Sequence, residues 1–191
     1  MAEKTNLCDI VQQSLDWCPG APQFAGMQGR ALYTAVSNIL QWPEREQTAA
    51  GADLAAYKKD SNFTLKADKK WCAIDILPAK STATSDPQGE LPSQSQLNKL
   101  SLVHPGTGEK ASNAAAYINN VPCVFLVMDM DGNWRVAGCK RWANEIKATV
   151  KHDQGQGAAG TAQTTIEVEA PDTTNFPVFK GTLDEDLDIA A

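Results

Sequence analysis

The segment VPCVFLVMDMDGNWRVAGC constrains the fold most strongly, because it has the pattern of two strands joined by a tight turn. Val124 to Met130 form an apolar run typical of a buried strand. Asp131-Gly132-Asn133 supply turn residues, and the chain returns through Trp134 to Cys139. Two hydrophobic runs separated by such residues are the strongest short-range sign of a β-hairpin. We therefore predict a hairpin here.

Further short strands are indicated on both sides of this hairpin. Alternating or apolar patterns predict them at Ala31 to Val36, Trp71 to Leu77, Lys99 to His104 and Thr165 to Ala170. In the second of these, the side chains of Cys72, Ile74 and Ile76 are expected on one face and that of Asp75 on the other.

Two segments have helix-like composition. Ser112 to Asn119 combine a capping residue, three alanines and an Asn-Asn stop before a proline, which predicts a short helix. Residues 48–60 also favour a helix, but Lys59 to Asn62 look like a turn leading into Phe63 to Leu65. A hairpin therefore competes with a helix there, and we prefer the hairpin. Many short strands with one short flanking helix predict a mainly β fold, an antiparallel β-sandwich or barrel with extended loops.

Length and composition bound the remaining choices. The 191 residues fit a single domain, 1–191, with 42% hydrophobic and 21% charged residues, and no apolar run has the length of a membrane span. The amino terminus has no signal-peptide pattern, so we expect synthesis in the cytoplasm. The five cysteines include no C-x-x-C pair, which predicts reduced, mostly buried thiols.

Charge is uneven along the chain. The formal net charge is −6, and residues 151–191 carry 2 basic and 8 acidic groups, which by themselves account for −6. Such a chain lacks the clustered Lys and Arg that grip nucleic acid. An acidic tail of about residues 184–191 is expected to be solvated.

The spacing Gly155-x-Gly157-x-x-Gly160 matches the dinucleotide-binding fingerprint. That fingerprint needs a buried strand before the glycines and a helix after them. Here polar residues precede the glycines and the β-branched segment TTIEVEA follows, so we predict a flexible connection between strands. A calcium loop around Gly132 also fails, because its first and twelfth positions would be Val127 and Gly138.

Enzyme chemistry has little support in the sequence. His104 and His152 are the only histidines, and no nucleophile-elbow motif accompanies them. We expect no catalytic residue, no cofactor and no metal. The five tryptophans are expected in the core or at subunit interfaces.

About twenty residues from 79 to 98 are rich in Ser, Thr, Gln, Pro and Gly and have no apolar period. Loops of this length are uncommon in compact domains and usually serve a function. The segment is either a mobile surface loop or an arm that becomes ordered against a partner. An amino-terminal segment of about residues 1–28 is likewise rich in turn signals.

The order of these features resembles the major tail proteins of tailed bacteriophages, the subunits of the tail tube. Trp42-Pro43 close the first strand region, and KKWCAIDIL precedes the polar loop GELPSQSQLNK. A short helix precedes VPCVFLVMDMDGNWRVAGC, and the Gly-rich GQGAAG is followed by a Thr-rich strand and a closing aromatic-Lys-Gly unit. The resemblance covers residues 26 to 183.

The resemblance implies a virion protein assembled in the cytoplasm of a bacterial host, whose hexameric rings stack into a hollow tube. Its partners would be copies of itself and other tail proteins such as the tape measure and tail terminator, with DNA passing through the lumen without specific binding and no membrane. The candidate residues are an inter-subunit arm (Ser81, Asp86, Glu90, Ser93, Gln94, Gln96), an assembly joint (Gly155, Gly157, Gly160) and lumen-facing acids that would repel DNA phosphates (Glu167, Glu169).

Other functions remain open on the sequence alone. Related readings are a tail terminator or the inner tube of a contractile injection machine. Outside that class are a monomeric β-sandwich binding module that uses the polar loop to hold a ligand, and a small enzyme without a recognised motif.

Overall fold

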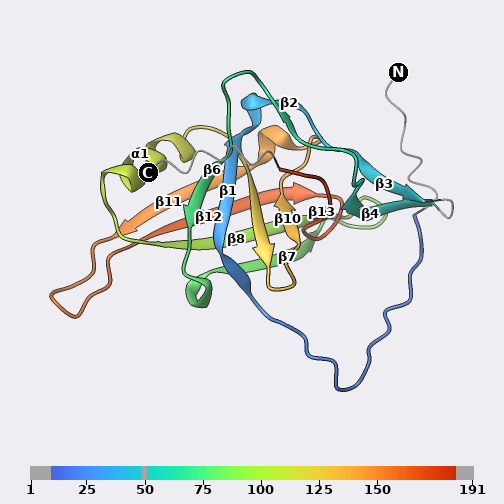
Figure 1. Cartoon of the computed structure of the whole chain (residues 1–191), viewed down its shortest axis with the longest axis horizontal. Helices are drawn as coiled ribbons and strands as arrows, with labels where there is room; N and C mark the ends of the chain where they lie inside the picture. Colours follow the sequence, from blue (N-terminus) through green and yellow to red (C-terminus); the bar gives the residue numbers. More distant parts are fainter. Residues whose placement is uncertain (1–9, 49–50, 184–191) are drawn as a thin grey trace.

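The computed structural model describes residues 10–48 and 51–183, and within them the protein is mainly β, as the sequence predicts (Figure 1). The strands are β1 (Met27–Ala35), β2 (Ile39–Gln41), β3 (Arg45–Thr48), β4 (Gly51–Tyr57), β5 (Thr64–Leu65), β6 (Cys72–Asp75), β7 (Thr82–Gln88), β8 (Ser95–Pro105), β9 (Cys123–Asp129), β10 (Trp134–Ala137), β11 (Lys147–Asp153), β12 (Gln163–Asp172) and β13 (Val178–Phe179). The described helices are α1 (Glu109–Ile118) and the short 3-10 turns η2 (Val36–Asn38), η3 (Pro78–Lys80) and η4 (Ala143–Glu145).

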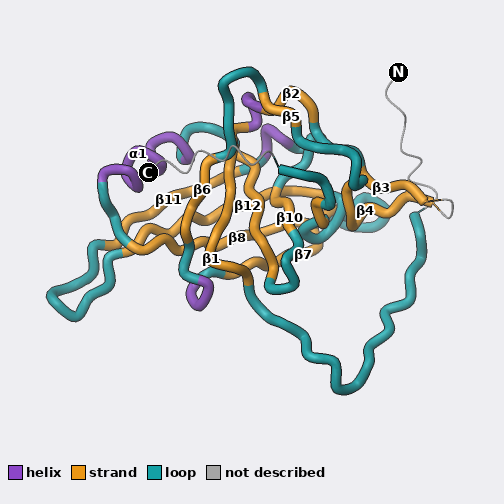
Figure 2. The backbone as a smooth tube through the Cα atoms, viewed as in Figure 1, coloured by secondary structure: helices purple, strands orange, loops and turns teal. Residues whose placement is uncertain are grey.

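These strands form two main sheets. One has the order β3-β4-β13-β10-β9-β1-β6, the other has the order β11-β12-β8-β7, and β2 pairs with β5 alone. The strands of the two sheets cross steeply, with β1, β9 and β10 running across the direction of β8, β11 and β12 (Figures 1 and 2). Pairing is antiparallel except between β4 and β13, which are parallel where Ala56 meets Val178.

The core lies between the two sheets. Leu32, Leu126 and Val136 of the larger sheet are fully buried in one cluster with Leu102 and Val168 of the smaller sheet. Burying such side chains contributes about 1.5–3 kcal/mol each. At one end the cluster continues as packed aromatic rings, with Phe63 in contact with Trp42, Trp71 and Phe179.

The predicted central hairpin is confirmed as β9 and β10. Asp129 fixes its turn, because the Asn133 amide donates to the Asp129 carboxylate at 2.8 Å and the Arg135 Nε donates to it at 2.9 Å. Burial raises the pKa of Asp129, but hydrogen bonds from Asn133 and Arg135 outweigh it and leave the pKa below its ordinary value. The Asp129 carboxylate therefore stabilises the turn of the hairpin.

Several local predictions are wrong in detail. Residues 51–57 are a strand, but β4 pairs with β3 and β13, whereas the strand at Thr64–Leu65 pairs with β2. Cys72 lies on the same face of β6 as Ile74 in the strand register, as predicted, but it is exposed at the start of this short edge strand, whereas Ile74 and Ile76 are buried. Cys18 is exposed too, so the thiols that the structure describes are not mostly buried.

The helix α1 begins earlier than predicted. Gly108 precedes its first turn, and the Ser112 amide donates to the Gly108 carbonyl at 3.0 Å, so Ser112 lies inside the helix and does not cap it. Ala115 and Ile118 are its buried residues, and it packs against β11. The helix ends at Ile118, one residue before the predicted stop.

Candidate assembly surfaces

The segment from Val11 to Gly26 leaves the body of the molecule as a long loop without regular strands (Figure 1). It is attached by a parallel bridge between Ile10 and Ala52, and returns to the fold at Met27. Leu15 is 98% exposed, Trp17 66% and Phe24 64%. Trp17 is therefore outside the core, and of the two places expected for the tryptophans only a subunit interface applies to it.

The prediction that residues 79–98 form one long polar loop is wrong. Residues 82–88 and 95–98 are strand residues of β7 and β8, which pair in antiparallel register from Thr82 opposite Ser101 to Gln88 opposite Ser95. Both faces of β7 are largely exposed, so its sequence carries no apolar alternation and gives no strand signal. What protrudes is the turn of residues 89–94.

The six candidate arm residues consequently have different environments. Ser81 is buried, where its hydroxyl donates to the Leu77 carbonyl at 2.9 Å and accepts from the Val103 amide at 3.0 Å. Asp86 and Gln96 are strand residues, and Asp86 pairs with Lys99 at 2.9 Å.

The remaining three, Glu90, Ser93 and Gln94, are exposed in the turn. The turn closes on itself, because the Ser93 amide donates to the Glu90 carbonyl at 2.7 Å. Leu91 at its tip is 85% exposed. An arm reaching a neighbour is thus limited to this turn.

The two edges of the four-stranded sheet differ. Helix α1 packs along β11, and the Asn119 side chain accepts a 2.7 Å hydrogen bond from the outward-pointing amide of Val150. At the opposite end of the sheet order, β7 is the terminal strand and lies open to solvent on both faces. Open edge strands are the usual place for pairing with another chain. Pro87 limits such pairing in β7, because proline has no backbone N–H to donate.

Gly155, Gly157 and Gly160 lie in the loop that joins β11 to β12, so the prediction of a connection between strands is confirmed. The loop is tightly packed: a Cβ on Gly160 would lie 2.3 Å from the Gln156 amide nitrogen. The Asp153 carboxylate accepts from the Gly155 amide at 2.9 Å. The loop projects from the end of the sheet (Figure 1). Because β12 follows it, the helix that a nucleotide site needs is missing at this position.

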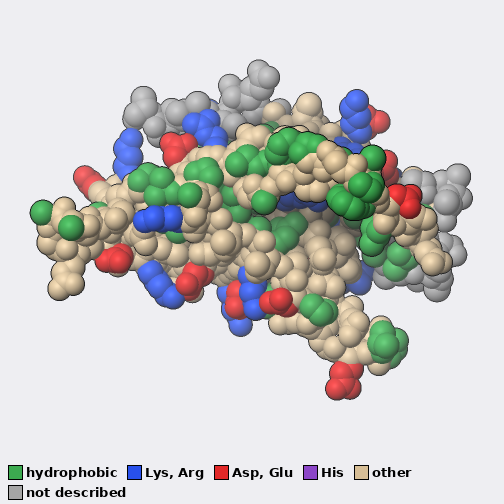
Figure 3. Space-filling view, turned by 90° about the horizontal axis from the view of Figure 1, so that it is seen from below, with side chains coloured by type: hydrophobic (Ala, Val, Ile, Leu, Met, Phe, Trp, Pro, Cys, Tyr) green, Lys and Arg blue, Asp and Glu red, His purple; other side chains and the backbone are tan. Residues whose placement is uncertain are grey.

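Glu167 and Glu169 point outward from β12, whose inward residues Ile166, Val168 and Ala170 are buried, which confirms the predicted alternation. Lys151 on β11 pairs with Glu167 at 2.6 Å. Glu169 lies between Lys147 and Lys99 in the strand register. This face is therefore mixed in charge, and side chains of both signs are interspersed on the molecule seen from below (Figure 3).

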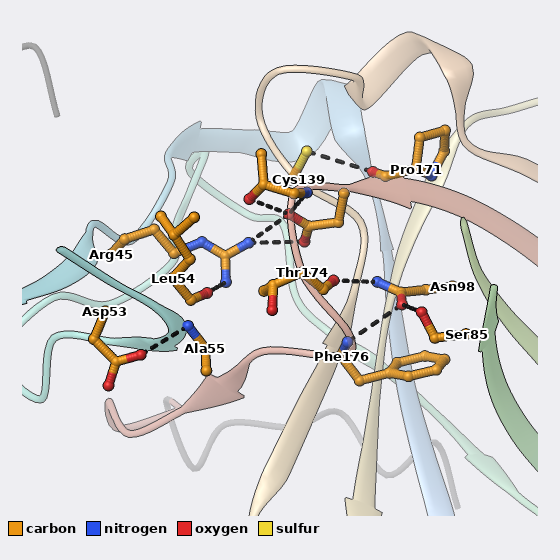
Figure 4. A network of polar contacts seen from close by, with 12 residues as sticks. Arg45, Asp53, Leu54, Ala55, Ser85, Asn98, Cys139, Pro171, Thr174 and Phe176 are labelled. Atoms are coloured by element: carbon orange, nitrogen blue, oxygen red, sulfur yellow. Dashed lines mark hydrogen bonds and ion pairs between the residues drawn. The ribbon is translucent and has the colours of Figure 1, made fainter. Parts of the chain in front are cut away.

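A buried polar network ties the ends of the two sheets together (Figure 4). Arg45 donates through one terminal nitrogen to both oxygens of Asp172 at 2.7 Å and through the other to the Leu54 carbonyl at 2.9 Å. Its guanidinium lies 4.2 Å from the ring centre of Tyr57. The Asp172 side chain is 1% exposed. Burial raises the pKa of Asp172, and the nearby guanidinium opposes that rise.

The second half of the network centres on Asn98, which is fully buried. Its amide group donates to the Thr174 carbonyl at 3.1 Å, while its oxygen accepts from the Ser85 hydroxyl at 2.7 Å and from the Phe176 amide at 3.3 Å (Figure 4). Strands β7 and β8 are thus fastened to the chain that follows β12. Each polar group has a partner inside the protein, which is the arrangement expected of a structural network.

The histidines make structural contacts. His104 Nδ1 lies 2.7 Å from the Asp75 carbonyl, which can only accept, so Nδ1 carries the proton. His152 Nδ1 lies 2.8 Å from the Thr164 hydroxyl. Within residues 10–48 and 51–183, no group of three or more His, Cys, Asp or Glu side chains could hold a metal ion. In the same residues, no helix is long and apolar enough to cross a bilayer.

Comparison with protein-family models, with curated proteins and with solved structures finds no match to this chain.

Sequence reasoning missed the features that most distinguish the surface. Strand β11 has only Ala148 and Val150 half-buried, so its alternation is too weak to be found. The exposed apolar side chains of residues 11–26 could have been suspected, because Leu15, Trp17 and Phe24 occur singly among polar and turn residues and belong to no sustained apolar pattern.

Proposed function

We propose that this protein is a structural subunit that assembles with copies of itself into rings, and that the rings stack into a tube of the kind found in bacteriophage tails. In this proposal the site of action is the virion tail, and DNA passes through the lumen without specific binding. The observation that carries the proposal is the exposed amino-terminal segment with Leu15, Trp17 and Phe24.

The energetic argument concerns these three side chains. Full burial of an exposed apolar side chain contributes about 1.5–3 kcal/mol, and because Trp17 and Phe24 are already about one third buried, the three together represent about 3–7 kcal/mol that the isolated chain does not gain. A segment of this kind, projecting from a folded body, is suited to cover a neighbouring copy. The order of the sequence features and the open strand β7 also support a self-assembling subunit.

The earlier candidate residues take narrower roles in this proposal. Glu90, Ser93 and Gln94 would contact the next ring from the turn between β7 and β8, whereas Ser81 holds that hairpin to the body. The glycine loop of residues 155–160 would be a second contact point. If the face bearing Glu167 and Glu169 lines the lumen, the lysines beside them leave its charge balanced, and DNA would be neither held nor strongly repelled.

Native mass spectrometry with negative-stain microscopy tests the proposal. We expect rings or tubes built on six subunits for the unmodified chain. The triple substitution L15S/W17S/F24S should give monomers with an unchanged thermal unfolding midpoint. A matched control, L40S/Y117S/M130S, replaces three other exposed apolar side chains and should still assemble.

A strictly monomeric unmodified chain at every concentration would overturn the proposal and favour a monomeric binding module. Equal loss of assembly in both triple variants would remove the special role of the amino-terminal segment.

A further inference from the structure

A lysine-lined cavity lies beside β5. Its volume is about 740 Å³, and Lys66, Lys69 and Lys70 line it together with Phe63 and Trp71. The three lysines are exposed on a turn closed by a hydrogen bond from the Lys69 amide to the Lys66 carbonyl at 3.1 Å. In the part of the chain that the structure describes, none of these three lysines forms an ion pair with a carboxylate.

The charge of this cavity is unbalanced. Asp68 is the single carboxylate among its described lining residues, against the three lysines. The surface therefore has a local excess of two positive charges on a protein whose formal net charge is −6. An anionic ligand with several carboxylates would complement it.

The chain after β13 forms part of the lining of the same cavity. The Asn62 side chain forms two hydrogen bonds with Thr182: its oxygen accepts from the Thr182 amide at 2.9 Å, and its amide group donates to the Thr182 hydroxyl at 3.1 Å. Gly181 is required for this approach, because a Cβ there would lie 2.2 Å from the Asn62 side-chain oxygen. Thr182 and Leu183 both line the cavity.

The residues that follow are acidic. Residues 184–191 read DEDLDIAA, with carboxylates at Asp184, Glu185, Asp186 and Asp188, and lie outside the described residues. We propose that the lysine-lined cavity is a binding site for an acidic peptide, and that residues 184–191 of the same chain occupy it. The clamp on Thr182 starts the segment at the cavity, and its charge complements the three lysines.

Reach and local concentration both favour binding within one chain. Residues 184–188 can extend about 3.3 Å each, or roughly 16 Å, which spans a cavity of this size. A segment attached this closely has an effective concentration on the order of millimolar, so weak ion pairs are sufficient. Bound in this way, the segment neutralises the lysines and excludes other polyanions. This inference goes beyond the proposed function and does not rest on it, because it concerns a single copy.

Carbodiimide coupling of the full chain tests the inference, because the reagent joins a carboxylate and an amine that are in contact through an amide bond with loss of water. Peptide mapping should find the carboxylates of residues 184–188 coupled to Lys66, Lys69 or Lys70. The yield should fall at least threefold in 0.5 M NaCl, where the charges are screened. A mixture of ¹⁴N- and ¹⁵N-labelled protein should give links within chains of one isotope.

Two variants sharpen the result. D184N/E185Q/D186N/D188N removes the carboxylates and should bind a heparin column more tightly than the unmodified chain, because the lysines are uncovered. Lys147→Ser, at an exposed lysine on β11, should change neither the links nor the heparin elution.

Links no more frequent at the three lysines than at Lys147 would overturn the inference. So would links formed only between chains of different isotopes, which would assign the cavity to a neighbour's segment. Ring formation is measured separately by native mass, so failure here and failure of the assembly proposal are distinguishable.

Discussion

Replacing Arg45 with methionine removes one partner of the buried ion pair and leaves the other in place. The Asp172 side chain is 1% exposed, and it would keep the hydrogen bonds from the Thr173 amide at 2.6 Å and hydroxyl at 3.2 Å while losing both short bonds to Arg45. Removing one member of a buried pair costs about 3–5 kcal/mol. Because Thr173 still contacts the carboxylate, we expect the free energy of unfolding to fall by about 3 kcal/mol at pH 7, the lower end of this range.

The reverse substitution should cost less. Arg45 is 15% exposed, so after Asp172→Asn its guanidinium can reach water and still donate to the Leu54 carbonyl. The expected loss is about 1.5–3 kcal/mol, the usual contribution of hydrogen bonds to a charged group. The double variant R45M/D172N should lose less than the sum of the single losses, because it leaves no unpaired charge.

The loss in R45M should also depend on pH. Burial raises the pKa of Asp172 and Arg45 opposes the rise, so the variant holds the proton to higher pH than the unmodified protein does. When the folded-state pKa of a carboxyl lies above its unfolded value, the contribution of that carboxyl to stability is fully present below about pH 3.9 and is lost as pH rises through the folded-state pKa. The difference in the free energy of unfolding between R45M and the unmodified protein should therefore be small near pH 4 and grow toward pH 8.

Urea unfolding of the four proteins at several pH values measures these differences. An R45M loss below about 1 kcal/mol at pH 7, or single losses that add in the double variant, would refute the view that the pair is a coupled buried unit.

Two further perturbations test smaller features. Asp129→Asn should lose about 1–2 kcal/mol at pH 7 in urea unfolding, because the bond from Arg135 loses its charge. Since the folded-state pKa of Asp129 is lowered, this advantage of the carboxylate is present above about pH 3.9 and lost as pH falls; a difference that persists at pH 2 would contradict the assignment. Gly160→Ala should lower the thermal midpoint by several degrees through the 2.3 Å backbone clash, whereas Gly108→Ala, with nothing within 4 Å, should leave it nearly unchanged; equal shifts would count against the packed loop.

The sequence predicted those elements whose burial alternates or is complete. Strands β9 and β12 were found because one carries a continuous apolar run and the other alternates buried and exposed side chains. Strand β7 was missed because it is held by backbone pairing with β8 and by the hydrogen bond from Ser85 to the buried Asn98. Neither interaction leaves an apolar pattern in the sequence. The same cause made residues 79–98 look like a long loop.

The candidate surfaces were less predictable than the fold. Composition identified the segment of residues 79–98 as unusual, but not that Ser81 would be buried while Glu90 is exposed. The burial of Ser81 depends on its hydrogen bonds to Leu77 and Val103, which lie outside the polar segment, and the composition of the segment does not encode them. The lining of the lysine-lined cavity includes Asn62 and Thr182, which are hydrogen-bonded although they are 120 positions apart.

The unequal edges of the four-stranded sheet limit the symmetry of any assembly. An open β7 can pair with the β7 of a second copy around a twofold axis. That contact occupies the β7 edge of both copies, so the sheet cannot grow beyond two copies. Continuing the sheet from copy to copy would need β7 to meet β11, where α1 and Asn119 already occupy the edge. A closed ring built through β7 must therefore join it to a different surface of the next copy in a heterologous contact, which gives every subunit the same direction around the ring.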